Sequence, residues 1–207
     1  MSDDTPHHLG PHEALELLGP AHPLIYRSLE YAVSRAAAYF EAHLPVDPYL
    51  FSGLVRYHNR LVLARRSPSI EGFEVIRLRN IGTRLKFGGL TIRLWKATGD
   101  GYLPPPGNSG SKADYYDQPY LPGLEQPIGT RLAVLWEADQ SLALTEVNLV
   151  CPKGTTKPWV HGEEHWRIAI PHPAEAEFAD VRFEVDAEEI DLELALDQTA
   201  ETDDDEW

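Results

Sequence analysis

Cysteine, long apolar runs and basic residues are all scarce in this sequence of 207 residues. The single cysteine, Cys151, excludes an internal disulfide framework and is typical of a reducing cytoplasm. No uninterrupted apolar run approaches the roughly 18 residues that a membrane span needs, so we expect no membrane partner. The N-terminal residues show neither the basic nor the apolar segment of a secretory signal. Together these absences predict a cytoplasmic protein.

The charge is unbalanced and unevenly distributed. The chain carries 18 basic and 33 acidic side chains, a formal net charge of −15. Residues 174–207 hold 15 acidic residues and one base, whereas residues 56–96 hold ten bases and two acids. An acidic surface repels nucleic-acid phosphates, but a segment of net charge +8 could still bind an anion. The total charge therefore does not exclude anionic partners.

The hydrophobic pattern changes period near Gly72, which predicts an α+β fold. Residues 11–66 show the apolar spacing of helices, and Asp47-Pro48 is an N-cap and first-turn pair. Residues 72–170 contain alternating segments typical of strands, interrupted by a loop rich in proline and glycine with a helical turn at Ser111–Asp117. We expect an N-terminal helical hairpin packed on a mainly antiparallel β-sheet, with an acidic C-terminal tail.

These segments predict one domain, residues 11–197, preceded by a flexible leader at 1–10 and followed by a disordered acidic end at 198–207. Residues 180–197 alternate acidic and apolar side chains, so they could form strands or a helix. The acidic tail is therefore expected to be folded over most of its length.

The lengths of two predicted turns set the strand register and predict a basic face on the sheet. Gly88-Gly89 is a two-residue hairpin signal that pairs Arg84 with Arg93. A second two-residue turn at Ile81-Gly82 would bring the bases of the preceding strand to the same side. The predicted basic face then consists of Arg77, Arg79, Arg84, Lys86 and Arg93, with Trp95 beside them. A slip of one residue at Ile81-Gly82 would move the first two arginines to the core face.

Like charges on one small face repel one another unless an anion covers them. Nucleic acid, an acidic partner protein and the acidic tail are the three candidates for that anion. The structural alternative is that these lysines and arginines only solubilise an exposed sheet.

Two further segments suggest chemistry. Ser109, Ser111 and Lys112 precede the helical turn and could hold an anion, although the order differs from a phosphate-binding P-loop. His161, Glu164 and His165 match the H-x-x-E-H pattern of inverted zinc peptidases. That chemistry needs a helix that places both histidines on one face, whereas a strand-like run follows here, so a solvated loop or strand is the alternative. We assign no catalytic residue and no cofactor.

The segments PPPGNSGSKADYYDQP, LAVLWEAD and NLVCPKG resemble a family of uncharacterised bacterial proteins. The resemblance covers roughly residues 50–170. It implies genes beside helix-turn-helix regulators fused to ImmA/IrrE-type peptidase domains, in toxin–antitoxin or defence-like cassettes. Since the H-x-x-E-H string departs from the H-E-x-x-H of such peptidases, the resemblance implies the companion protein and carries over no catalytic residue.

These observations predict a non-enzymatic protein-interaction component of a bacterial regulatory, toxin–antitoxin or anti-phage defence-type cassette. Its partner would be a co-encoded protein, a regulator or a toxin or antitoxin, bound through the basic face and the acidic tail. One alternative is a nucleic-acid-binding protein that uses the same face, stacks Trp95 on bases and is autoinhibited by the tail. A second alternative is a metal-dependent hydrolase at the H-x-x-E-H string.

Overall fold

The computed structural model describes residues 9–43, 45–78, 82–99, 101–107, 109–117, 130–154 and 159–173. The chain divides into two compact units, Met1–Pro173 and Ala174–Trp207, and the described residues all belong to the first. The predictions for residues 1–8 and for the acidic tail lie outside the described residues and stay predictions. Leu9, which the sequence places in a flexible leader, is buried, and its carbonyl accepts a hydrogen bond from Trp166 Nε1 at 2.9 Å.

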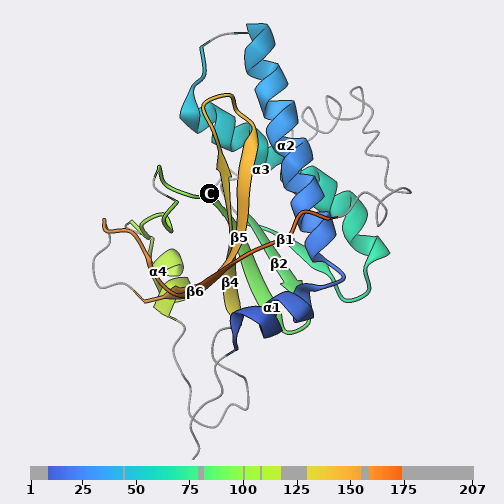
Figure 1. The fold of residues 1–207 in the computed structure, drawn as a ribbon, viewed down its shortest axis with the longest axis vertical. Helices are drawn as coiled ribbons and strands as arrows, with labels where there is room; N and C mark the ends of the chain where they lie inside the picture. Colours follow the sequence, from blue (N-terminus) through green and yellow to red (C-terminus); the bar gives the residue numbers. More distant parts are fainter. Residues whose placement is uncertain are drawn as a thin grey trace, which may run out of the picture. The chain divides into compact units, whose positions relative to one another are not determined.

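Three helices make up the first part of the unit: α1 (Pro11–Leu18), α2 (His22–His43) and α3 (Pro48–Arg66). Helix α3 begins as predicted, because Asp47 Oδ1 accepts hydrogen bonds from the backbone N–H groups of Tyr49 at 2.7 Å and Leu50 at 3.0 Å. Helices α2 and α3 form the expected hairpin, which Figure 1 shows beside the sheet. None of the described helices is both long and apolar enough to cross a membrane.

Within the described ranges, the strands form one six-stranded sheet in the order β1-β2-β3-β4-β5-β6. Their bounds are β1 (Glu74–Arg77), β2 (Thr83–Phe87), β3 (Leu90–Lys96), β4 (Arg131–Ala138), β5 (Leu144–Lys153) and β6 (Glu163–Ala169). All neighbouring strands are antiparallel except β3 and β4, whose connection contains helix α4 (Gly110–Asp117). The predicted α+β fold, a helical hairpin followed by a mainly antiparallel sheet, is confirmed.

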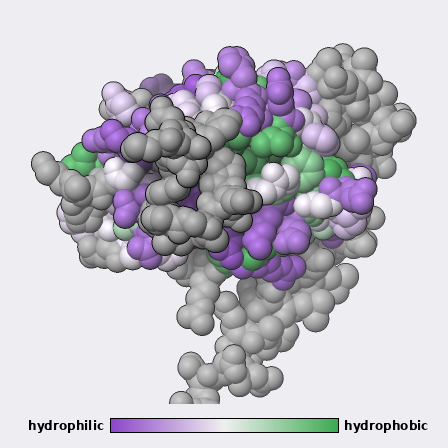
Figure 2. All heavy atoms as spheres, turned by 90° about the horizontal axis from the view of Figure 1, so that it is seen from below, coloured by the Kyte–Doolittle hydropathy of each residue, from purple (hydrophilic) through white to green (hydrophobic). Residues whose placement is uncertain are grey.

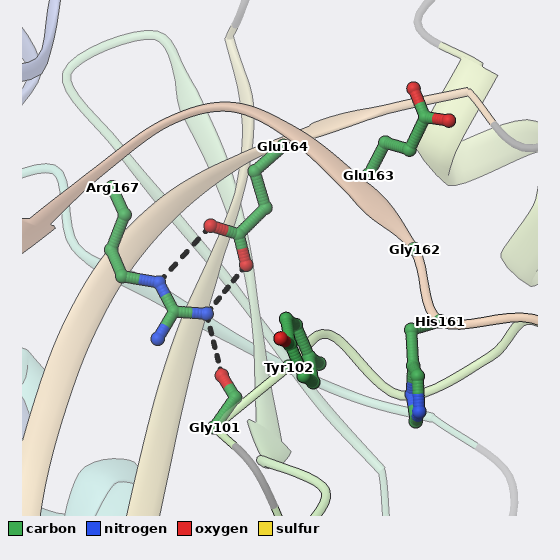
Figure 3. Close-up of a pocket in the computed structure, with 7 residues that line it drawn as sticks. All are labelled: Gly101, Tyr102, His161, Gly162, Glu163, Glu164 and Arg167. Carbon is green, nitrogen blue, oxygen red and sulfur yellow. Dashed lines mark hydrogen bonds and ion pairs between the residues drawn. The ribbon is translucent and has the colours of Figure 1, made fainter.

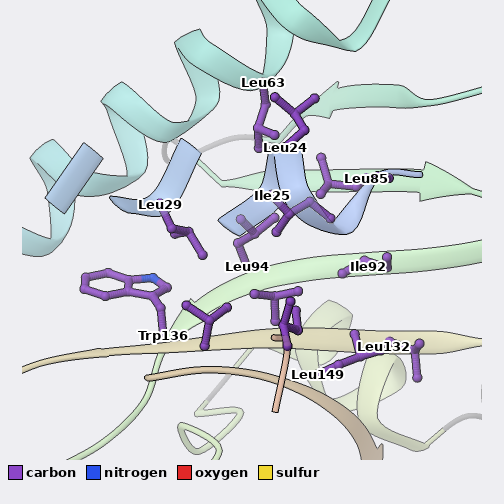
Figure 4. Close-up of a cluster of buried hydrophobic side chains, with 14 of the residues drawn as sticks. Leu24, Ile25, Leu29, Leu63, Leu85, Ile92, Leu94, Leu132, Trp136 and Leu149 are labelled. Carbon is purple, nitrogen blue, oxygen red and sulfur yellow. The ribbon is translucent and has the colours of Figure 1, made fainter. Parts of the chain in front are cut away.

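Helices cover both faces of the sheet. On one face, Ile25 and Leu29 of α2 point toward sheet residues such as Leu94 and Trp136 (Figure 4). On the other face, α4 places two tyrosines on a smaller apolar cluster, whose buried members are Ala97, Leu103, Tyr115, Tyr116, Ala133, Leu135 and Val150. We call this second side the α4 face. Seen from below, the described surface of the protein is mainly hydrophilic (Figure 2).

The strand register confirms one predicted turn and corrects the other. Arg84 pairs with Arg93 across the Gly88-Gly89 turn, as expected. The predicted pairing of Arg77 with Lys86 is wrong, because Arg77 pairs with Thr83 and Ile76 pairs with Arg84. The β1–β2 connection spans residues 78–82, where the N–H of Leu78 donates to the Gly82 carbonyl at 2.9 Å. The observed pairing differs from the predicted one by an odd number of residues, so Arg77 lies on the face opposite Arg84.

Candidate functional site

Basic side chains from three strands and a helix gather on the α4 face. Arg84 and Arg93 are cross-strand neighbours there, and Thr91, which lies on the same face as Arg93, pairs with Arg131 at the start of β4. Lys86 is exposed on the same face, opposite Thr91. We call the following set the cationic surface: Arg84, Lys86, Arg93, Lys112 and Arg131. Of the predicted basic face, Arg77 is therefore excluded, and Arg79 lies outside the described residues.

Arg93 lies at the centre of the cationic surface and packs on aromatic rings. Its guanidinium carbon lies 4.5 Å from the centroid of Tyr115 and 6.0 Å from that of Trp95. Burial lowers the pKa of Arg93, and the positive charges of Arg84 and Arg131 lower it further. Tyr115 and Tyr116 act in the opposite direction and raise this pKa, so the two arginines are the neighbours that disfavour the charged form of Arg93.

Tyr115 fixes α4 against the sheet beneath Arg93. Its hydroxyl lies 2.6 Å from the carbonyl oxygens of both Thr91 and Leu132 and shares its single proton between them. Burial raises the pKa of Tyr115, so the hydroxyl keeps its proton and remains a donor. The Tyr115 ring, on which Arg93 packs, is therefore held in place by both parallel strands, β3 and β4.

Lys112 joins the two anion sites that the sequence suggests separately. Its Nζ donates to the Pro105 carbonyl at 2.8 Å and lies 5.2 Å from the centroid of Trp95. Burial, together with the nearby charge of Arg93, lowers the pKa of Lys112 to about 8. The neighbouring Ser111 hydroxyl accepts a hydrogen bond from Arg93 Nη2 at 3.4 Å. The predicted anion loop and basic face thus form one surface, a proximity that residue spacing alone does not predict.

Two buried donors on this surface lack acceptors. Across the described part of the chain, three buried side-chain nitrogen or oxygen atoms have no hydrogen-bond partner, and two of them are Arg84 Nε and Arg93 Nε. Buried polar atoms are nearly always hydrogen-bonded in folded proteins, so each exception calls for an explanation. A bound anion would supply acceptors to both nitrogens once the guanidinium groups shift toward it, because each Nε is buried in the free protein.

The H-x-x-E-H residues do not form the helix that a zinc peptidase of this type requires. His161 precedes β6, and Glu164 and His165 lie within the strand. Glu164 is committed to an ion pair with Arg167, with its two carboxylate oxygens 2.6 and 3.0 Å from the guanidinium nitrogens. Within the described ranges, no three histidine, cysteine, aspartate or glutamate side chains are grouped to hold a metal ion.

A pocket of about 650 Å³ lies beside β6 and is not predicted by the sequence. It is lined by Gly101, Tyr102, His161, Gly162, Glu163, Glu164 and Arg167 (Figure 3). Its two sides come from segments far apart in the chain, and the isolated bridge between Leu103 and Gly162 brings them together. Only the tertiary structure therefore reveals this pocket.

Comparison of the chain with protein-family models, with curated proteins and with solved structures finds no match. The functional argument therefore depends on the residues of the surface and of the pocket.

Proposed function

We propose that the chain is a non-enzymatic protein-interaction component that binds an acidic segment of a partner protein through the cationic surface. The partner would be the product of a neighbouring gene in a bacterial regulatory, toxin–antitoxin or anti-phage defence-type cassette, as the sequence resemblance implies. The observation that carries the proposal is the pair of buried arginine Nε atoms without acceptors, surrounded by further cations.

An acidic ligand would remove two unfavourable features at once. It would neutralise the mutual repulsion of Arg84, Arg93 and Arg131, which adds to burial in lowering the pKa of Arg93. Its carboxylates would also accept hydrogen bonds from the two Nε groups, and charge-assisted bonds of this kind are stronger than neutral ones. The donors and charges of the cationic surface would therefore be better compensated in a complex than in the free protein.

A protein ligand fits the surroundings of Trp95 better than a nucleic acid does. Stacking on bases needs an open ring face. Arg93 and Lys112 lie over the Trp95 ring, at 6.0 and 5.2 Å from its centroid. The rings of Tyr115 and Tyr116 meet it in edge-on contacts. Carboxylates could reach these cations without occupying the Trp95 ring face, whereas a stacked base must occupy it.

The test compares ligand classes on the same protein. An oligoglutamate peptide and a short single-stranded oligonucleotide are titrated into the full chain by calorimetry at two salt concentrations. The peptide should bind, and Arg84→Glu should weaken that binding about tenfold, because the reversed charge repels the carboxylates. Lys86→Glu, at an exposed position, should weaken it in the same direction without disturbing the packing.

Arg56→Glu is the matched control, since Arg56 is an exposed arginine on α3, away from the cationic surface. It changes the net charge equally and should leave peptide affinity nearly unchanged. If all three variants lost peptide affinity equally, the effect would depend on total charge and not on the cationic surface. That result would contradict the proposal. If the oligonucleotide bound more tightly than the peptide, with a steep dependence on salt, the partner would be a nucleic acid and not an acidic protein. Co-purification with the products of neighbouring genes then tests the cassette assignment.

A further inference from the structure

The pocket beside β6 has an aromatic wall in a fixed orientation. Tyr102 is 51% exposed, and its ring is stacked on His161 with centroids 5.2 Å apart and planes 26° apart. His161 Nδ1 lies 3.4 Å from Thr98 Oγ1, a contact that holds the imidazole in place. Figure 3 shows the Tyr102 ring across the pocket from the ion pair of Glu164 with Arg167. A flat group entering the pocket would meet an aromatic surface that is already positioned.

Arg167 forms part of the other wall of the pocket and has more than one carboxylate near it. Arg167 Nη2 donates to the Gly101 carbonyl at 2.6 Å in addition to its bonds with Glu164. The hydrogen bond from Arg167 to Glu164 raises the pKa of Arg167 most, and the charges of Glu164, Glu137 and Glu146 raise it further. Three carboxylates therefore act on a single guanidinium.

Gly101 allows two of these charged groups to approach the backbone. Its φ angle is 76°, and a Cβ at this position would lie only 2.8 Å from Glu137 Oε1 and 3.6 Å from Arg167 Nη1. A residue with a side chain would push the carboxylate away. The approach of Glu137 to this wall of the pocket thus depends on a glycine at position 101.

We infer that this pocket binds an organic cation, a guanidinium or ammonium group of the kind carried by arginine and lysine side chains and by free polyamines. An aromatic face together with nearby carboxylates is the arrangement that binds such cations. The cation lies against the Tyr102 ring and is attracted by the surplus carboxylate charge behind Arg167. The pocket shares no residue with the cationic surface, so the inference does not depend on the proposed function.

The test uses N-acetyl-arginine methylamide and spermidine as probes, titrated separately into the full chain and followed by calorimetry. Tyr102→Ala removes the aromatic wall at a half-exposed position and should lower the affinity about tenfold. Tyr102→Phe keeps the ring and should retain affinity. Tyr49→Ala is the matched control, because Tyr49 is a tyrosine on α3 that is 89% exposed.

Because acidic residues elsewhere in the chain attract cations, only the part of the affinity that Tyr102→Ala removes counts as binding in the pocket. Tyr102-dependent binding of the arginine derivative indicates a peptide side chain as the natural ligand, and Tyr102-dependent binding of spermidine indicates a free polyamine. Two results would overturn the inference: affinity for both probes that is unchanged in Tyr102→Ala, or equally tight binding of N-acetyl-glutamate methylamide to the unmodified chain.

Discussion

Lys112 should make binding to the cationic surface depend on pH in a defined direction. In the free protein, burial lowers the pKa of Lys112 to about 8, so the side chain loses its charge just above neutral pH. A carboxylate bound beside it favours the charged form and raises this pKa, so that a proton is taken up on binding. Affinity for an acidic peptide must therefore fall as the pH rises through 8.

The size of the effect follows from the two pKa values. If binding restored the pKa of Lys112 to about 10.5, affinity would fall roughly tenfold between pH 7 and pH 9. Solvent screening of this partly exposed lysine reduces the expected fall to about three- to fivefold. Calorimetric titrations of an oligoglutamate peptide at pH 7, 8 and 9, at constant ionic strength, measure it directly.

Lys112→Arg supplies the control, because arginine stays charged throughout this range and should give nearly constant affinity. A flat profile in the unmodified protein would show that the lysine does not meet the ligand. The same fall in Lys112→Arg would assign the effect to another titrating group. Either result would refute the reasoning.

Three other predictions concern stability, measured by urea denaturation. Tyr115→Phe should lower the free energy of unfolding by about 1–3 kcal/mol, because the carbonyls of Thr91 and Leu132 lose their shared donor, and an unchanged value would contradict that role for the hydroxyl. Burial and the nearby Arg35 lower the pKa of His58 to about 4. The unfolded chain therefore binds the proton more readily, and stability should fall by about 1–2 kcal/mol from pH 7 to pH 4.5 after allowance for screening. His58→Gln should reduce that fall, and an equal fall would assign it to other groups. Gly101→Ala should cost about 1–3 kcal/mol, since the φ angle of 76° and the contact with Glu137 both oppose a side chain, and a cost near zero would contradict this account of the loop.

The two turns of the β1–β2–β3 segment show what the sequence can predict about register. The Gly88-Gly89 turn was predictable because a two-residue hairpin allows one pairing, and both glycines take the positive φ values of 54° and 81° that such a turn requires. The β1–β2 register was not predictable, because no local signal specifies that β1 ends at Arg77 and pairs this residue with Thr83. This difference in register is why the prediction incorrectly placed Arg77 on the basic face.

The composition of the cationic surface was only partly predictable. Alternation along β2 and β3 correctly grouped Arg84, Lys86, Arg93 and Trp95 on one face of the hairpin. The approach of Lys112 depends on how α4 packs across β3 and β4, two parallel strands whose connection is long. Such contacts between distant segments are determined by packing and not by local pattern, so the sequence indicated the anion loop and the basic face as separate sites.

The most direct test of the central claim follows the Nε–H signals of Arg84 and Arg93 in an NMR titration with the oligoglutamate peptide. These two donors lack acceptors in the free protein. Binding to the cationic surface should give them acceptors, so both signals should shift and exchange more slowly with water. The signal of Arg56, whose Nε already donates to the Ser52 carbonyl at 3.1 Å, should stay in place. Peptide binding that leaves Arg84 and Arg93 unchanged would contradict the account.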